Sequence, residues 1–473
     1  MQRAGRVNRL GSTFPKVYIF NFFPTTQSDE HLGLEVNITN KIQMFHDILG
    51  EDAKYLSDGE EFGSQELFNT LNNKTTECTM EEYDLFNRDI VAYLDSKNSK
   101  IEELIRNGML VEDDVNEFEI ANEKYLALQN SRTLELTIIV TDDCNFKCGY
   151  CYQEDREYKY MNDEVLNSIL NYIEKNSSNY SSVKINWFGG EPLLAFSQIE
   201  QFMMQCIKIC EKNHLSLVGA ATTNGYLLDY HLMEKLINLK VFLFQITLDG
   251  SKEIHNRLRP HKVNNNSFEK IVDNLSGITE FVKKYYRIVL RVNITKDLVK
   301  NIDGFIEDLQ FIRKNKKIFI NCQKMGDYGG DGIKDLYSQV VSDIEYKKVY
   351  STFLKNSVNM TQQPTSNVGS GLCSACLKSS YYIDQDGNVL KCSLAIYDNN
   401  FASKNIIGHL ELDGTMRIFD DNEDIWIKQS NPDKECISCK FYPLCFNHYC
   451  PLRRMQQNKK ICYAYKKSIV SSI

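Results

Sequence analysis

The sequence has no long apolar run and no excess of positive charge, and each absence excludes a class of protein. No stretch of the 473 residues approaches the ~18 consecutive apolar residues that a membrane-spanning helix needs. The net charge is −8, so nothing favours a nucleic-acid backbone or an anionic membrane as partner. The N-terminal arginines are not followed by the apolar segment of a secretory signal, which leads us to expect a cytoplasmic location.

Internal repeats and low-complexity tracts are also missing, and the composition, 42% hydrophobic and 25% charged, is that of a globular protein. The length allows about two to four domains and a hydrophobic core large enough to be stable without disulfides or bound metal. The 15 cysteines are nevertheless unevenly placed, with three at 144–151 and eight at 373–462. In a reducing compartment such clusters indicate metal or iron–sulfur ligands rather than disulfides.

Residues 135 to 324 alternate β-rich runs with amphipathic stretches. This alternation predicts an α/β fold with a parallel sheet and outer helices, as either an open wound sheet or a partial barrel. In both folds, functional residues gather at the carboxyl ends of the strands. The six expected strands are ELTIIVT (135–141), VKINWFGG (183–190), LVGAATTNG (217–225), VFLFQITLDG (241–250), RIVLRVNIT (287–295) and KIFINCQK (317–324).

The stretch CNFKCGYC, which follows the first expected strand, contains Cys144, Cys148 and Cys151. Three thiolates are one short of a closed zinc site, but they suit a [4Fe–4S] cluster that leaves one iron open. A zinc site or an incidental cysteine cluster is the alternative. The next strand ends in WFGGEP, whose two glycines allow close approach of the backbone to a ligand, and Glu191 supplies a carboxylate.

These motifs resemble those of the radical S-adenosylmethionine (SAM) enzymes. The resemblance implies a partial (β/α)6 barrel and an open iron that holds the methionyl part of SAM, whose reductive cleavage yields a 5′-deoxyadenosyl radical. It implies no particular catalytic residue. Thr247 and Asp249 have an alternative role as turn residues, and His255 and His261 are expected on the surface. The implied SAM contacts are Gly189, Gly190, Glu191 and Pro192 for the ammonium group, Asn224, Thr247 and Asp249 in the pocket, and Arg291 and Asn293 for the carboxylate or ribose.

The C-terminal cysteines, together with YYIDQDGNVLKC, resemble the SPASM extension of radical SAM enzymes, which holds auxiliary [4Fe–4S] clusters. Three clusters are therefore expected in all, although paired zinc ribbons are an alternative. Four residues separate Cys445 from Cys450, where the family has three. Because Cys373 and Cys376 are closely spaced, the alternative is that only one of them is a ligand and that one iron of cluster I stays open. By analogy, cluster I takes Cys373, Cys376, Cys392 and Cys450, and cluster II takes Cys436, Cys439, Cys445 and Cys462.

The first residues, MQRAGRVNRLGS and VYIFNFFPT, resemble the C-terminal tail of a superfamily 2 helicase. The chain has no GxxxxGK[ST] loop to hold phosphates, so this segment is expected to be non-catalytic. The expected domains are a helicase-tail-like segment (1–78), a small mostly helical module (79–130), the radical SAM partial barrel (131–330), a helix and linker (331–372) and the SPASM domain (373–473).

The resemblance favours an enzyme that modifies a ribosomally made precursor peptide by a thioether or carbon–carbon crosslink, with a flavodoxin or ferredoxin as electron donor. The first alternative is an anaerobic sulfatase-maturing enzyme that makes formylglycine. Such enzymes carry an Asp as base directly after the cysteine matched by Cys392, where this chain has Ser393. The alternative from another class is a nucleic-acid-binding protein with zinc ribbons.

Overall fold

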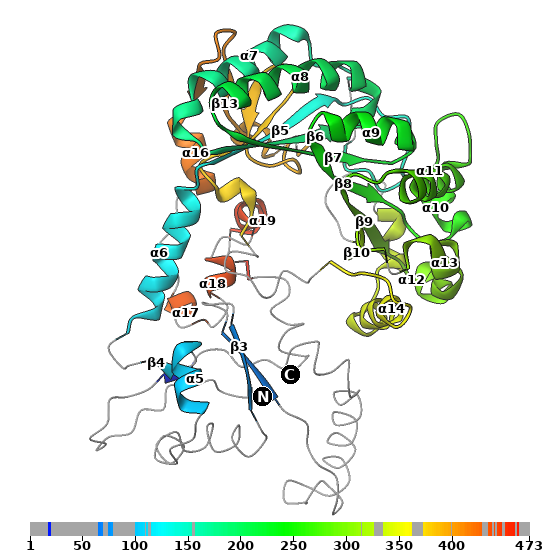
Figure 1. Ribbon diagram of the computed structural model, residues 1–473, viewed down its shortest axis with the longest axis horizontal. Coiled ribbons are helices and arrows are strands. Elements are labelled where there is room, and N and C mark those ends of the chain that lie inside the picture. The colour runs from blue at the N-terminus through cyan, green and yellow to red at the C-terminus, as the bar shows by residue number, and fades with distance from the viewer. Residues whose placement is uncertain are drawn as a thin grey trace, which may run out of the picture. The chain divides into compact units, whose positions relative to one another are not determined.

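The computed structural model describes residues 18–19, 65–69, 74–78 and 100–462, the last range with gaps at 109, 112–114, 154–156, 314, 326–333, 362–371, 399, 428–433, 438, 440–441, 447–449 and 459–460. The chain divides into two compact units, both drawn in Figure 1. The barrel unit combines residues 129–362 with 374–428. The terminal unit combines residues 1–128 with 363–373 and 429–473. The domain boundaries expected from the sequence stay predictions.

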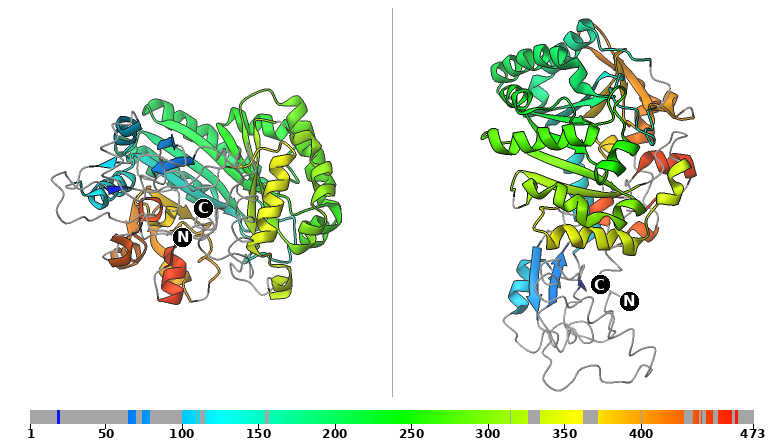
Figure 2. Two further views of the ribbon diagram at one scale, coloured as in Figure 1. Left: turned by 90° about the horizontal axis from the view of Figure 1, so that it is seen from below. Right: turned by 90° about the vertical axis from the view of Figure 1, so that its right-hand side faces the viewer.

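The barrel unit is built on a ten-stranded sheet in which six parallel strands lie in chain order. Because β5 pairs with β11 on its outer side rather than with β10, the six strands form an open arc (Figure 2). This arrangement confirms the predicted partial barrel. The strands are β5 (Thr133–Thr141), β6 (Ser182–Gly189), β7 (Ser216–Thr223), β8 (Val241–Thr247), β9 (Arg287–Ile294) and β10 (Ile318–Lys324).

Helices connect these strands and cover the outer face of the arc (Figure 1). Helix α7 begins where the Asn162 side chain accepts a hydrogen bond from the backbone N–H of Val165, and it buries one apolar face. The helices are α7 (Asp163–Lys175), α8 (Phe196–Lys212), α9 (Tyr230–Asn238), α10 (Lys252–Leu258), α11 (Ser267–Phe281), α12 (Lys296–Lys300), α13 (Ile302–Asp308) and α14 (Asp343–Lys355), with short 3-10 turns η1 (Ser177–Asn179), η2 (Pro192–Ala195), η3 (Gln310–Ile312) and η4 (Lys334–Gln339).

The side chains of β6 alternate between the two faces of the sheet, as the period of a strand requires. Trp187 is fully buried on the outer face, where its ring meets Phe202 of α8 at 5.3 Å between centroids. On the inner face, Asn186 Nδ2 and Lys184 Nζ each donate to Glu135 Oε1, at 2.8 and 2.6 Å. The interior of the arc therefore carries polar side chains and can accommodate polar ligands.

The sheet continues into an antiparallel meander after the barrel. Strand β11 runs parallel to β5, and each following strand reverses direction. The elements are η5 (Ser374–Cys376), β11 (Ser380–Ile383), β12 (Asn388–Leu390), α15 (Ala402–Asn405), β13 (Ile406–Leu410), β14 (Met416–Ile418) and α16 (Asp420–Ile427).

The terminal unit contains two short antiparallel pairs, β1 with β4 and β2 with β3, together with small helices. Its core packs Tyr125 against Tyr442 and Phe446, with Cys436 buried beside them. The helicase-like motif lies outside the described residues. No helix in the described ranges is long and apolar enough to cross a membrane. The elements are β1 (Tyr18–Ile19), β2 (Gln65–Asn69), β3 (Lys74–Cys78), α5 (Lys100–Arg106), β4 (Leu110–Val111), α6 (Glu117–Gln129), α17 (Lys434–Ile437), α18 (Tyr442–Cys445) and α19 (Pro451–Gln457).

Candidate active site

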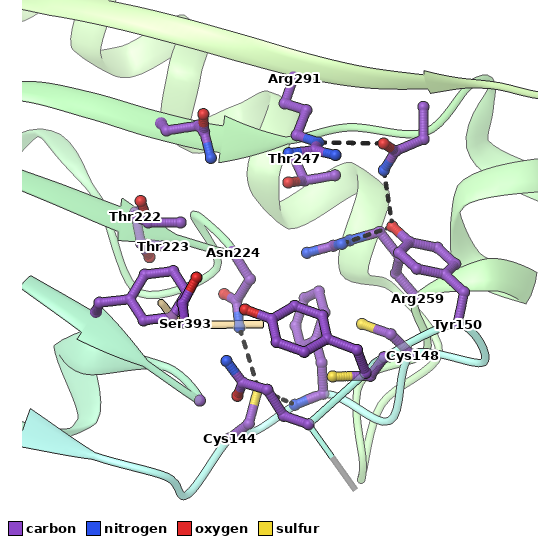
Figure 3. Close-up of a pocket in the computed structure, with 18 of the residues that line it drawn as sticks. Cys144, Cys148, Tyr150, Thr222, Thr223, Asn224, Thr247, Arg259, Arg291 and Ser393 are labelled. Atoms are coloured by element: carbon purple, nitrogen blue, oxygen red, sulfur yellow. Dashed lines mark hydrogen bonds between the residues drawn. The ribbon is translucent and has the colours of Figure 1, made fainter. Parts of the chain in front are cut away.

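A cavity of about 490 Å³ opens among the carboxyl ends of the parallel strands (Figure 3). Its wall combines the cysteine loop after β5, the ends of β6 to β10 and the segment after β12. The lining residues are Cys144, Phe146, Cys148, Tyr150, Cys151, Tyr152, Gln153, Phe188, Gly189, Gly190, Thr222, Thr223, Asn224, Gln245, Thr247, Arg259, Arg291, Asn293, Gln323, Met325, Ser393 and Leu394.

The three cysteines of the loop all face this cavity. Burial raises the pKa of the Cys148 thiol to about 12, Arg259 opposes the rise, and Cys151 and Cys144 add to it. The three sulfurs are thus close enough to sense one another's charge, and bound metal would have to displace their protons.

This donor set fits an iron–sulfur cluster held by three thiolates. Among the described residues, no three Cys, His, Asp or Glu side chains converge tightly enough to hold a single metal ion. A cluster of four irons spaces its thiolate ligands more widely than one ion does. With three thiolates as ligands, such a cluster would keep one iron without a protein ligand.

The cysteine loop is fixed by backbone hydrogen bonds to the segment that follows α10. Lys147 N–H donates to the Pro260 carbonyl at 2.9 Å, and Gly149 N–H donates to the Leu258 carbonyl at 3.0 Å. These two bonds tie the loop to that segment.

The glycine turn after β6 passes against the backbone that leads into the cysteine loop. Gly189 has φ +133°, and a Cβ on it would lie 1.9 Å from the Thr141 carbonyl oxygen. A Cβ on Gly190 would lie 2.1 Å from the Asp143 oxygen. Both positions therefore require glycine because of the chain itself, and both still line the cavity.

Glu191 is fully buried, and it is not part of the cavity wall. Its carboxylate accepts hydrogen bonds from Thr223 Oγ1 at 2.7 Å, from Asn224 N–H at 2.7 Å and from Leu193 N–H at 3.1 Å. Burial raises its pKa, and these bonds act in the opposite direction. Glu191 thus fixes the end of β7, and Pro192 likewise does not line the cavity.

Asn224 joins the end of β7 to the cysteine loop. Its Nδ2 donates to Asn145 Oδ1 at 2.6 Å and lies 3.9 Å from Cys144 Sγ. Among the other sequence-predicted contacts, Thr247, Arg291 and Asn293 line the cavity, whereas Asp249 does not.

Asp249 is instead the centre of a buried network behind the cysteine loop. Its Oδ1 accepts from the backbone N–H and Nδ2 of Asn293 at 3.0 and 3.1 Å, and its Oδ2 accepts from the Tyr150 hydroxyl. His255 Nδ1 accepts from the Asp249 backbone N–H at 3.1 Å. His255 is fully buried in α10, so the expectation of a surface position was wrong. Its helix turns the side chain inward, where burial lowers its pKa.

Sequence patterns did not indicate Tyr150, Tyr152 or Arg259, yet all three line the cavity. Burial raises the pKa of Tyr152, and its neighbours Gln153 and Ser393 oppose the rise. Burial acts to lower the pKa of Arg259, but Cys148, Tyr150 and Asp249 hold it well above its usual range. The position of Tyr150 between two predicted ligands was a usable signal, and Arg259 lies in the stretch TLDGSKEIHNRLRP, which also resembles the family but was not assigned a role at this residue.

The C-terminal cysteines are divided between the units, with Cys376 and Cys392 in the barrel unit and the other six in the terminal unit. The Cys376 carbonyl accepts from Gln129 Nε2 at 2.6 Å. Asn405 Oδ1 accepts from Cys392 N–H at 2.9 Å, and Asn405 Nδ2 donates to the Cys392 carbonyl at 2.8 Å. Two predicted ligands are therefore held by remote amide side chains.

Residues 138–306 match the model of the radical SAM superfamily. This range begins in β5, ends in α13 and includes the three cysteines and the glycine turn. The chain therefore contains a radical SAM domain, a class whose cofactors are SAM and a [4Fe–4S] cluster. The match confirms the resemblance to radical SAM enzymes and the two cofactor classes, while the SPASM extension and the number of clusters stay predictions.

The chain is similar to a sulfatase-maturating enzyme and to a cyclopropyl synthase. A cysteine-type anaerobic sulfatase-maturating enzyme of Clostridium perfringens is 26% identical over 331 residues, which cover 64% of this chain and 84% of that protein. The radical SAM cyclopropyl synthase TigE of Paramaledivibacter caminithermalis is 24% identical over 263 residues, covering 48% and 52%. The solved structure of native anSMEcpe with bound AdoMet has TM-score 0.53 and 21% identity, covering 72% of this chain and 95% of that one, which supports a shared fold.

Proposed function

We propose that this chain modifies a ribosomally made peptide by radical chemistry, forming a thioether or a carbon–carbon crosslink. The observation that carries the proposal is the cavity in which three thiols face the glycine turn and the polar ends of β7, β8 and β9. A polypeptide substrate is supported by the relatives named as sulfatase-maturating enzymes, whose substrate by that name is a protein.

The residues present suit both cofactors. Cys144, Cys148 and Cys151 would hold the [4Fe–4S] cluster, and SAM would lie across the cavity. When bound and reduced, these cofactors supply a 5′-deoxyadenosyl radical that abstracts a hydrogen atom. The proposed SAM contacts are the backbone of Gly189 and Gly190 and the side chains of Asn224, Thr247, Arg291 and Asn293.

Two residues in the sequence-derived set have an indirect role in this proposal. Glu191 fixes Thr223 and Asn224 at the end of β7, and Asp249 fixes Asn293 at the end of β9. Both carboxylates would therefore position SAM-binding groups instead of touching SAM. Pro192 begins η2 and would direct the chain away from the cavity.

The C-terminal cysteines are proposed to hold two auxiliary clusters, which would accept the electron that a crosslink releases. Forming the crosslink removes two hydrogens from the peptide, one as the abstracted atom and one as a proton with an electron left behind. A flavodoxin or ferredoxin is the proposed source of the electron that starts the reaction.

The second candidate function is formylglycine formation, which the 26% identity to the sulfatase-maturating enzyme favours. Against it, Ser393 lines the cavity at the position where such enzymes carry an Asp base. The described cavity wall contains no Asp or Glu at all. Removal of a proton by a carboxylate has no candidate there, which is why we rank this function second.

The test uses anaerobically reconstituted enzyme with SAM, dithionite and two peptides. One peptide is encoded by any short Cys-rich reading frame that a search of the neighbouring genes finds, and the other carries the cysteine motif of a sulfatase. The proposal predicts a crosslinked product of the first peptide, lighter by two hydrogens in its mass spectrum. An aldehyde on the second peptide, with the first unchanged, would contradict it in favour of formylglycine formation.

A further inference from the structure

Arg259 follows α10 and is carried by the same segment that anchors the cysteine loop. The residues on either side of it, Leu258 and Pro260, accept the hydrogen bonds from Gly149 and Lys147. The arginine is therefore attached to the loop through its two neighbours, and it lines the cavity beside Cys148 (Figure 3).

The guanidinium of Arg259 is buried, with only 9% of the residue exposed. Its Nη1 donates to the Tyr150 hydroxyl at 2.7 Å, a neutral partner. Its Nε is buried and finds no hydrogen-bond partner among the described residues. A buried cation is costly unless an anion lies close to it.

Asp249 is too far from Arg259 to balance its buried positive charge fully. The nearest approach of its carboxylate to Arg259 is 3.9 Å, beyond hydrogen-bond distance. Its oxygens already accept from Asn293 and Tyr150. Cys148, by contrast, lines the same cavity as Arg259. The charge of Arg259 is thus available to an anion at the cysteine loop.

We propose that Arg259 is a built-in counter-cation of the cluster at Cys144, Cys148 and Cys151, and that its charge raises the reduction potential of that cluster. The inference rests on the proposed function, because it takes the cluster as bound. Reduction transfers one electron from the external donor to the cluster and adds one negative charge, with no bond formed or broken. A buried cation stabilises that added charge more than water would, and cluster potentials respond to local charge.

The test is a redox titration of the holoenzyme followed by electron paramagnetic resonance. The signal to follow is the one that changes when SAM is added, which separates this cluster from the auxiliary ones. Arg259→Gln should lower the reduced-to-oxidised ratio at a fixed ambient potential at least tenfold, or about 59 mV for a one-electron couple. Arg259→Lys, which keeps the charge, should stay within about twofold of the wild type.

Arg257→Gln is the matched control. It also removes one positive charge, two residues before Arg259, but from an exposed side chain of α10 that is paired with Asp297. Its potential should equal that of the wild type, because exposed charges are screened. If Arg259→Gln keeps its cluster at an unchanged potential but binds SAM more weakly, Arg259 is a SAM ligand and the inference is wrong.

If Arg259→Gln loses the cluster, the reduction potential of the Arg259→Lys variant tests the inference instead. A normal potential in the lysine variant supports the role of charge. Loss of the cluster in both variants overturns it, because the arginine would then only anchor Tyr150. A wild-type protein with no SAM-responsive cluster would overturn the proposed function and this inference together.

Discussion

Gly189 and Gly190 lie where the turn after β6 passes the backbone of residues 141–143. Two backbone bonds fix this crossing, from Gly190 N–H to the Thr141 carbonyl at 2.9 Å and from Glu191 N–H to the Asp143 carbonyl at 2.7 Å. The same glycines line the cavity. At the scale of single residues, chain geometry and ligand access thus impose the same requirement for glycine.

We expect Gly190→Ala to displace the cysteine loop, because its Cβ would lie 2.1 Å from the Asp143 carbonyl oxygen. A strained backbone of this kind costs roughly 1–3 kcal/mol. The melting temperature should fall, and the iron bound per chain should drop. Gly304→Ala is the control, because a Cβ there meets nothing within 4 Å. An alanine at 190 that leaves both the melting temperature and the iron content unchanged would show that the crossing is not tight.

At the scale of elements, the meander after β11 depends on Asn405, a fully buried side chain at the end of α15. It makes three hydrogen bonds to the backbone around Cys392. Its Oδ1 accepts from the N–H groups of Lys391 and Cys392, and its Nδ2 donates to the Cys392 carbonyl. The segment before β11 is tied down by Lys391 Nζ, which donates to the carbonyl of Leu377 at 2.8 Å.

Asn405→Ala should lower stability, since each buried backbone group that loses its partner costs about 1–3 kcal/mol. If Cys392 is a cluster ligand, iron content after anaerobic reconstitution should fall as well. Asn422→Ala removes a comparable bond, from Nδ2 to the Ile406 carbonyl at 2.8 Å, without touching Cys392. Equal iron loss in both variants would argue against a specific role for Asn405.

Helix α6 carries a buried acid in its first turn. Burial raises the pKa of Glu117 from 4.5 to about 8. Because the folded pKa lies above the unfolded one, the stabilising contribution is complete below pH 4.5 and is lost as pH rises through about 8. The loss amounts to about 1.4 kcal/mol per pH unit across that window.

Glu117→Gln should therefore flatten the pH dependence of the melting temperature between pH 5 and about 8. The exposed Glu119 on the same helix provides the control, and Glu119→Gln should keep the wild-type profile. If the melting temperatures of wild type and Glu117→Gln depend on pH in the same way, the Glu117 carboxyl is exposed to water and the prediction is wrong.

The barrel could be predicted from the sequence because each of its strands is a β-rich run followed by an amphipathic stretch. The expected run 183–190 became β6, Ser182–Gly189, and the run 241–250 contained β8, Val241–Thr247. The meander was not predicted as strands, because β12 and β14 have three residues each, too few for a period to register.

Where a motif places its residue directly at a strand end, as at Gly190 and Asn224, the residue lines the cavity, and its contact with SAM stays a prediction. Glu191 and Asp249 were placed in the right region, but their carboxylates turn away from the cavity to bind backbone and side-chain donors. Arg259 was not singled out from the sequence, because its place beside the cysteine loop depends on the hydrogen bonds of its two neighbours.

At the scale of the molecule, the predicted auxiliary ligands are distributed over both compact units, two of cluster I in each. The sequence boundary at residue 78 separates segments that are in contact within the terminal unit. Asn107 Nδ2 donates to Thr76 Oγ1 at 2.6 Å, and β1 pairs with β4.

The most direct test of the account is whether the cavity thiols are needed to cleave SAM. Wild type, Cys148→Ala and Cys206→Ala are reconstituted anaerobically, their iron is counted, and 5′-deoxyadenosine is measured after addition of SAM and dithionite. Cys206 is the control, a buried cysteine on α8 outside the cavity wall. We predict about twelve irons and ready SAM cleavage in wild type and Cys206→Ala, but about four fewer irons and no 5′-deoxyadenosine in Cys148→Ala. A Cys148→Ala variant that keeps its iron and still cleaves SAM would contradict the account.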